Sequence, residues 1–215
     1  MGGRGQGSGT GGGGSSSASS SGHSKALDRA LSAVENSIRH DSKESMHVFD
    51  ADGNELLNLG GGKTSVSFTL TEAQRFKDAV ITHNHPAGND RGGIGGTFSG
   101  ADIANTFKFG ASEMRAVTAE GTYVMTWVGG NGDKRGNATQ IANEFNKFNQ
   151  SVQSPLKQIE AYTRVVSDPK NANLTEAQID FETAKIVLTD YNNAWRGWWK
   201  DNAPAYGFAY KEFMS

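Results

Sequence analysis

The chain has 215 residues, a formal net charge of −2 and no cysteine. Its length suits one substantial domain with appendages, or two small domains. The slightly acidic balance argues against a nucleic-acid-binding surface. The absence of cysteine excludes disulfides, thiolate zinc sites and a cysteine nucleophile, so any metal must be held by His, Asp or Glu.

The apolar residues are too dispersed to form a membrane segment. No apolar run approaches the ~20 residues that cross a bilayer. The N-terminus also lacks the apolar core of a secretory signal. A cytoplasmic protein without a membrane partner is therefore expected.

Residues 1–24 are almost entirely glycine and serine. Such a segment buries too little apolar surface to offset the chain entropy that ordering would cost. We expect these residues to form a flexible, disordered linker or tail.

Residues 25–128 show alternating helix and strand signals. Asp52-Gly53 between two apolar runs is a strong hairpin signal. The other patterns rest on apolar periodicity and on capping residues. They predict a helix over 25–40, a strand over 64–70, a short helix begun by a capping box of Thr71 and Gln74, a buried strand over 78–83, a helix over 98–110 closed by Gly110, and a hairpin around Glu120-Gly121.

Residues 137–215 have a different character, since no strand pattern is found after residue 138. Helices are expected over 139–152, 155–166 and 175–200. Tyr191, Trp195 and Trp198 lie at helical spacing, which is typical of a core stripe. With Arg196 among them, they also suit an interface. The whole pattern predicts an α/β fold over residues 25–136, with a mixed, mostly antiparallel sheet flanked by helices, and a helical appendage over 137–215.

The stretch VITHNHPAGNDRGGIGGTFSGADI, residues 80–103, holds two of the five histidines. His83 and His85 point to the same side of an extended strand, with α-carbons about 6.5 Å apart at a rise of about 3.3 Å per residue. Pro86 cannot donate a ladder hydrogen bond and marks the strand end. Two imidazoles can thus converge on one ion where the sheet opens to solvent.

Two imidazoles bind zinc weakly, and a catalytic site usually has three protein ligands. Asp102, at the start of the next helix, is the candidate for the third; Asp90 is nearer in sequence but lies in a loop. Ser99 and Asp102 also form an ordinary capping-box pattern, which remains an alternative. The other histidines are assigned to no metal: His23 in the tail, His40 at a helix end and His47 on the first strand.

Together, "THNHPAG" and "FSGADI" resemble the zinc-site signature of the JAB/MPN superfamily, also called JAMM. The residues HNHPAG are most similar to the motif of RadC-like proteins and of phage head-morphogenesis-associated JAB domains. The resemblance covers roughly residues 43–128. One departure is the spacer, because 14 positions separate His85 from Ser99, several more than is usual in the family.

The resemblance implies a JAB/MPN-like, cytidine-deaminase-like domain over residues 25–136. It implies Zn2+ held by His83, His85 and Asp102, with a water that the metal activates. Glu44 would be the general base, and Glu35, within the first helix, is its rival. Ser99 would donate a hydrogen bond to the oxyanion that forms during attack.

A zinc-dependent metallopeptidase or isopeptidase is the function that the resemblance implies. Its substrate would be a protein or peptide, such as a ubiquitin-like tail or a phage structural protein, in the bacterial host cytosol or associated with phage. The alternative is a non-catalytic JAB-fold scaffold in a phage or bacterial assembly. A nuclease role by analogy with RadC-like proteins is disfavoured by the acidic charge balance.

Overall fold

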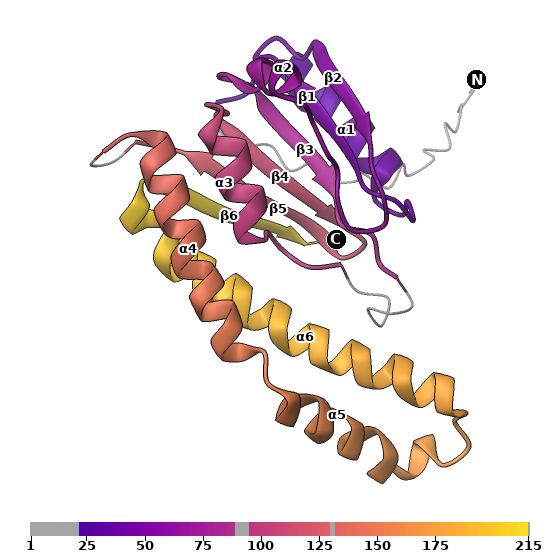
Figure 1. The fold of residues 1–215 in the computed structure, drawn as a ribbon. Coiled ribbons are helices and arrows are strands. Elements are labelled where there is room, and N and C mark those ends of the chain that lie inside the picture. Colours follow the sequence, from indigo (N-terminus) through magenta and orange to yellow (C-terminus); the bar gives the residue numbers. More distant parts are fainter. Residues whose placement is uncertain (1–21, 89–94, 130–131, 215) are drawn as a thin grey trace, which may run out of the picture.

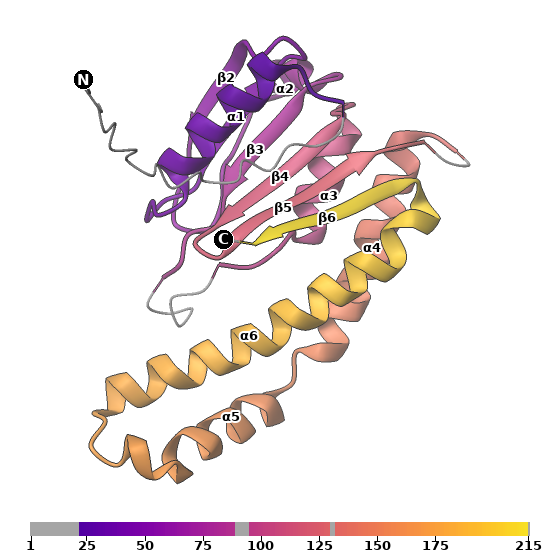
Figure 2. The same ribbon diagram turned by 180° about the vertical axis from the view of Figure 1, so that it is seen from behind.

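The structure, a computed structural model, describes residues 22–88, 95–129 and 132–214. A six-stranded sheet has α1 (Lys25–Ile38) on one face, and α3 (Gly100–Lys108) with α4 (Lys134–Val152) on the other (Figures 1 and 2). The strands are β1 (Ser45–Phe49), β2 (Glu55–Gly60), β3 (Val80–Asn84), β4 (Glu113–Thr118), β5 (Gly121–Trp127) and β6 (Phe208–Met214). The other helices are α2 (Leu70–Ala73), α5 (Pro155–Ser167) and α6 (Glu176–Asn202), with short 3-10 turns η1 (Gln74–Phe76), η3 (Pro169–Asn171) and η4 (Ala203–Tyr206).

The strand order is β2-β1-β3-β4-β5-β6. β3 and β4 run parallel, and the other neighbouring pairs run antiparallel. A parallel pair needs a crossover connection, and α3 supplies it. The expected α/β fold, with a mixed and mostly antiparallel sheet flanked by helices, is confirmed.

The central strand β3 is buried on both faces, and its alternating side chains belong to two different cores. Ile81 lies in the main core with residues of α3, α4 and α6. Val80 lies in a smaller core with Leu27 and Leu31 of α1. Because side chains alternate along a strand, His83 shares the α3 face with Ile81, whereas Thr82 shares the α1 face with Val80.

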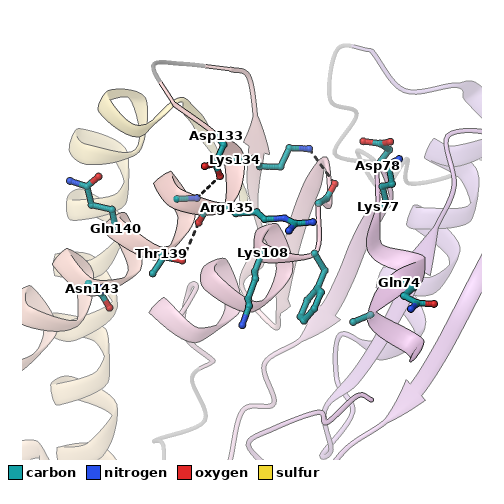
Figure 3. Close-up of a pocket in the computed structure, with 14 residues that line it drawn as sticks. Gln74, Lys77, Asp78, Lys108, Asp133, Lys134, Arg135, Thr139, Gln140 and Asn143 are labelled. Atoms are coloured by element: carbon teal, nitrogen blue, oxygen red, sulfur yellow. Dashed lines mark hydrogen bonds between the residues drawn. The ribbon is translucent and has the colours of Figure 1, made fainter. Parts of the chain in front are cut away.

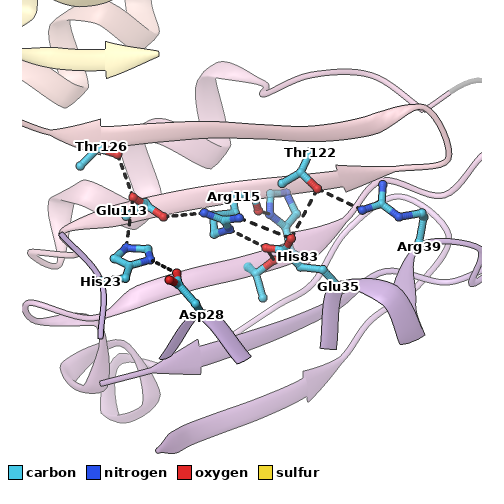
Figure 4. Close-up of polar contacts among 10 residues, drawn as sticks. His23, Asp28, Glu35, Arg39, His83, Glu113, Arg115, Thr122 and Thr126 are labelled. Carbon is cyan, nitrogen blue, oxygen red and sulfur yellow. Dashed lines mark hydrogen bonds and ion pairs between the residues drawn. The ribbon is translucent and has the colours of Figure 1, made fainter. Parts of the chain in front are cut away.

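A buried network of charges occupies the α1 face (Figure 4). The Arg115 guanidinium donates to Glu35, and also to Glu113 at 2.9 Å. The hydroxyls of Thr82 and Thr122 donate to the Glu35 carboxylate as well. Removing one member of such a buried pair leaves an uncompensated charge, so these groups stabilise the fold only as a set.

The start of the described chain differs from the expectation for the tail. Ser24 caps α1 by accepting a hydrogen bond from the Leu27 amide. The His23 ring lies 3.3 Å from an Asp28 oxygen and 3.5 Å from a Glu113 oxygen. Placing His23 in a disordered tail was therefore wrong, because two carboxylates hold its ring against the sheet. Residues 1–21 of the expected tail lie outside the described residues.

Two elements before β3 also differ from the prediction. Residues 64–69 form no strand, and their alternation arises because Val66 and Phe68 pack against the main core. The capping box of α2 is formed by Thr69 and Glu72. The predicted box of Thr71 and Gln74 is therefore two residues too late.

The C-terminal region is not purely helical, so that prediction was wrong. Residues 208–214 form β6, which pairs with β5 and places Phe208 in the main core. α4 begins at Lys134, capped by Asp133, five residues before the predicted start. The packed pair of α5 and α6 extends away from the sheet (Figure 1). None of the described helices is long and apolar enough to cross a membrane.

The His23 contacts predict a pH-dependent contribution to stability. The hydrogen bond and charge of Glu113, joined by Asp28, outweigh burial and raise the pKa of His23 above 6.5. Protonated His23 therefore stabilises the fold fully below its unfolded pKa, and this contribution is lost as the pH rises through the folded pKa. His23→Ala should cost more unfolding free energy at about pH 5.5 than at about pH 9 in urea titrations. An equal cost at both values would show that the His23 charge does not matter.

Candidate metal centre

The two histidines of the His-x-His pair face each other at the end of β3. His83 lies within the strand and His85 directly after it. Their Nε2 atoms are 2.7 Å apart, and both side chains are largely buried. The prediction that both rings project from the same side of the strand is confirmed.

Hydrogen bonds to the backbone determine which nitrogen of each ring is available. Nδ1 of His83 donates to the Arg115 carbonyl at 2.9 Å, and Nδ1 of His85 donates to the Gly96 carbonyl at 2.7 Å. A carbonyl can only accept, so each Nδ1 carries a proton and each neutral ring presents its Nε2 lone pair. Two lone pairs at this separation repel unless a proton or a metal ion lies between them.

Asp102 completes the group from the first turn of α3. Its Oδ1 lies 3.7 Å from Nε2 of His83, and its Oδ2 lies 3.5 Å from Nε2 of His85. Oδ2 also accepts a hydrogen bond from the Ser99 amide at 2.7 Å, while Ser99 Oγ accepts from the Asp102 amide. Asp102 is thus both a member of the capping box and a candidate ligand, because the hydrogen bonds of the helix cap orient its carboxylate toward the end of β3.

The ionisation of the group suits a cation. Burial, together with the charge of His85, lowers the pKa of His83 to about 4. Burial alone would lower the pKa of His85 too, but the hydrogen bond and charge of Asp102 raise it. Burial opposes the charge of Asp102, yet both histidines hold its pKa well below the usual range. At neutral pH, Asp102 is therefore anionic, and His83 is neutral and can offer its Nε2 lone pair to a metal ion.

These donors fit a zinc ion. One ligand atom from each of His83, His85 and Asp102 lies within 4.8 Å of the others. Zinc bonds of about 2.0 Å place tetrahedral ligands roughly 3.3 Å apart. The His–Asp separations already match this spacing, and the two Nε2 atoms need to part by only about half an ångström. Both Nδ1 atoms donate to backbone carbonyls. Metal-bound histidines usually make such a hydrogen bond through the nitrogen that does not bind the metal.

The two candidate bases lie on opposite faces of the sheet. Glu35 is 4 % exposed and its carboxylate is bound to Arg115 on the α1 face. Glu44 is 7 % exposed, directly precedes β1, and its charge contributes to raising the pKa of His85. Of the two, Glu44 is therefore the acid that acts electrostatically on His85.

Asn84, between the two histidines, is a functional residue that sequence reasoning missed. Its Oδ1 accepts from the Ser45 amide at 2.7 Å, and its Nδ2 donates to the Lys43 carbonyl at 2.9 Å. These two groups flank Glu44, so Asn84 anchors the backbone of that residue beside the strand end. The only signal in the sequence was its position, since this asparagine stands between the two histidines of the motif.

The other candidates do not join this group. Asp90 lies outside the described residues. Nδ1 of His47 lies 2.6 Å from a Glu55 oxygen on the neighbouring strand. A cavity of about 1300 Å³ lies at the far end of α3 (Figure 3), where its lining includes Lys77, Lys108 and Arg135 but none of the metal-site residues. It is therefore separate from the histidine pair.

The chain matches no known protein family, no curated protein and no solved structure. The assignment of this site therefore depends on its geometry and on its sequence motif.

Variants of two candidate ligands should lose metal affinity. His85→Ala or Asp102→Ala should weaken zinc binding more than about 100-fold, because a two-ligand site holds zinc poorly. The measurement is competition with a zinc-binding dye. His47→Ala is the control and should bind zinc as the parent does. Equal affinity in all four proteins would exclude this site.

Proposed function

We propose that the chain is a zinc-dependent metallopeptidase or isopeptidase of the JAB/MPN type. The observation that carries this proposal is the convergence of His83, His85 and Asp102 at one point. The charge of Glu44 also acts on His85. The resemblance of the motif to the JAMM signature supports the same class. No cofactor besides zinc is proposed.

Each residue has a distinct task in the proposed reaction. Zinc bound there would polarise a water molecule and lower its pKa toward about 7. Glu44 would accept a proton from a water molecule at this site and would later deliver it to the leaving amine. Ser99 accepts from the Asp102 amide through Oγ, so its hydroxyl proton remains able to donate to the substrate oxyanion.

The protein or peptide substrate enters where the sheet ends. Ser99 is exposed at the first turn of α3, so a substrate carbonyl can approach it from solvent. A ubiquitin-like tail and a phage structural protein are the substrate types that the motif favours. The alternative, a non-catalytic scaffold, would use the fold without the chemistry. The complete ligand set favours catalysis, because a scaffold has no need for it.

Glu44→Gln tests the proposal directly. The amide keeps the shape of the side chain but cannot accept the proton, so kcat should fall by about 10²–10⁴-fold. Zinc affinity should change little, since Glu44 is not a ligand. The assay is cleavage of a mixed peptide library and of diubiquitin by the zinc-loaded chain, read by mass spectrometry.

Glu35→Gln is the matched control, because it makes the same chemical change on the other face of the sheet. It should lower the unfolding free energy by about 3 kcal/mol, because buried Arg115 loses the Glu35 carboxylate as a partner. It should leave kcat of the folded protein near the parent value. A parent chain that cleaves none of these substrates would favour the scaffold, and a fully active Glu44→Gln variant would exclude Glu44 as the base.

A further inference from the structure

One face of α6 contacts three successive residues that lead into α3. Asn192, Trp195 and Trp199 are three and four positions apart, so they lie on the same side of the helix. Their contacts fall on residues 96–98. This short segment directly precedes Ser99, the N-terminal cap of α3.

Each of the three α6 residues makes a defined contact. Asn192 Oδ1 accepts from the Thr97 amide at 2.9 Å, and Trp199 Nε1 donates to the Phe98 carbonyl at 3.2 Å. The Trp195 ring packs on Gly96, where an added Cβ would lie 3.3 Å from the ring. α6 therefore contacts each of these three residues, and the Tyr210 hydroxyl of β6 also lies 3.2 Å from Thr97 Oγ1.

The same segment orients a metal ligand. The Gly96 carbonyl accepts a hydrogen bond from Nδ1 of His85 at 2.7 Å. Thr97, the residue bound by Asn192, follows directly. A shift of the Thr97 amide would move the Gly96 carbonyl and with it the His85 ring.

Asn192 is itself held in one orientation. It is 3 % exposed, and its Nδ2 donates to the Tyr123 hydroxyl of β5 at 3.2 Å. Its Oδ1 consequently faces Thr97. Without this acceptor, the buried Thr97 amide would lack its partner, and such a loss favours movement of the backbone.

We propose that Asn192 is a positioning residue for the metal centre, acting through Thr97 and Gly96 on His85. The inference rests on the proposed zinc site, but it does not depend on which bond the enzyme cleaves. It makes a residue of the C-terminal region part of the site, although Asn192 lies more than a hundred positions after His85 in the sequence.

The test compares zinc affinity across variants of the full chain. Asn192→Leu removes the acceptor and keeps a side chain of similar size, whereas Asn192→Ala removes both the acceptor and most of the side chain. Each variant should bind zinc about tenfold more weakly than the parent. Asn192→Asp keeps an acceptor for Thr97, while the Tyr123 hydroxyl donates to its other oxygen. This variant should bind zinc within about threefold of the parent.

Val187→Ala is the matched control on the same helix. Val187 is 7 % exposed and packs with Ala161 and Tyr191, on the side of α6 that faces α5. It should lower thermal stability without changing zinc affinity.

The visible absorption of the Co2+-loaded chain provides a readout that stability alone does not move. It should change in Asn192→Leu and Asn192→Ala and stay unchanged in Val187→Ala. Parent-like affinity and spectra in both acceptor-free variants would overturn the positioning role alone. Equal losses in Asn192→Asp and Asn192→Leu would also overturn it, since the acceptor would then not be the cause. A parent chain that binds no zinc would overturn the proposed function as well.

Discussion

The backbone carbonyls of Arg115 and Gly96 determine which way the paired imidazoles face. Each accepts a hydrogen bond from Nδ1 of one histidine, so both Nε2 atoms face the Asp102 carboxylate. The Arg115 carbonyl belongs to β4, which pairs in parallel with β3. The Gly96 carbonyl belongs to the segment that α6 holds. The site therefore depends on the sheet, on the first turn of α3 and on the C-terminal helix together.

Much of the fold could be predicted from local patterns, because the patterns and the packing agree there. Leu27 and Leu31 give the helical period of α1, and Asp52-Gly53 gives the first hairpin. The errors arise where tertiary packing produces a misleading pattern. Val66 and Phe68 alternate as in a strand, yet they pack on the core without a pairing partner. Strand β6 was missed because its pairing with β5 crosses the whole helical region.

The candidate site was predicted more completely than the fold around it. His83, His85 and Asp102 lie together as the motif required, because strand alternation and helix capping are both short-range rules. What the sequence could not provide was the support of these residues. The hydrogen bond from Thr97 to Asn192 joins residues 95 positions apart. Likewise, the burial of Glu35 beside Arg115 becomes evident only when α1 is seen on the opposite face of the sheet.

We propose that two imidazoles and one carboxylate bind a single zinc ion, and this binding can be measured. Zinc-edge X-ray absorption of the full chain, loaded with one equivalent of zinc, tests it most directly. We expect scattering from two imidazole rings together with oxygen ligands, all at about 2.0–2.2 Å from the metal. A zinc shell made only of oxygen atoms, without imidazole scattering, would contradict it.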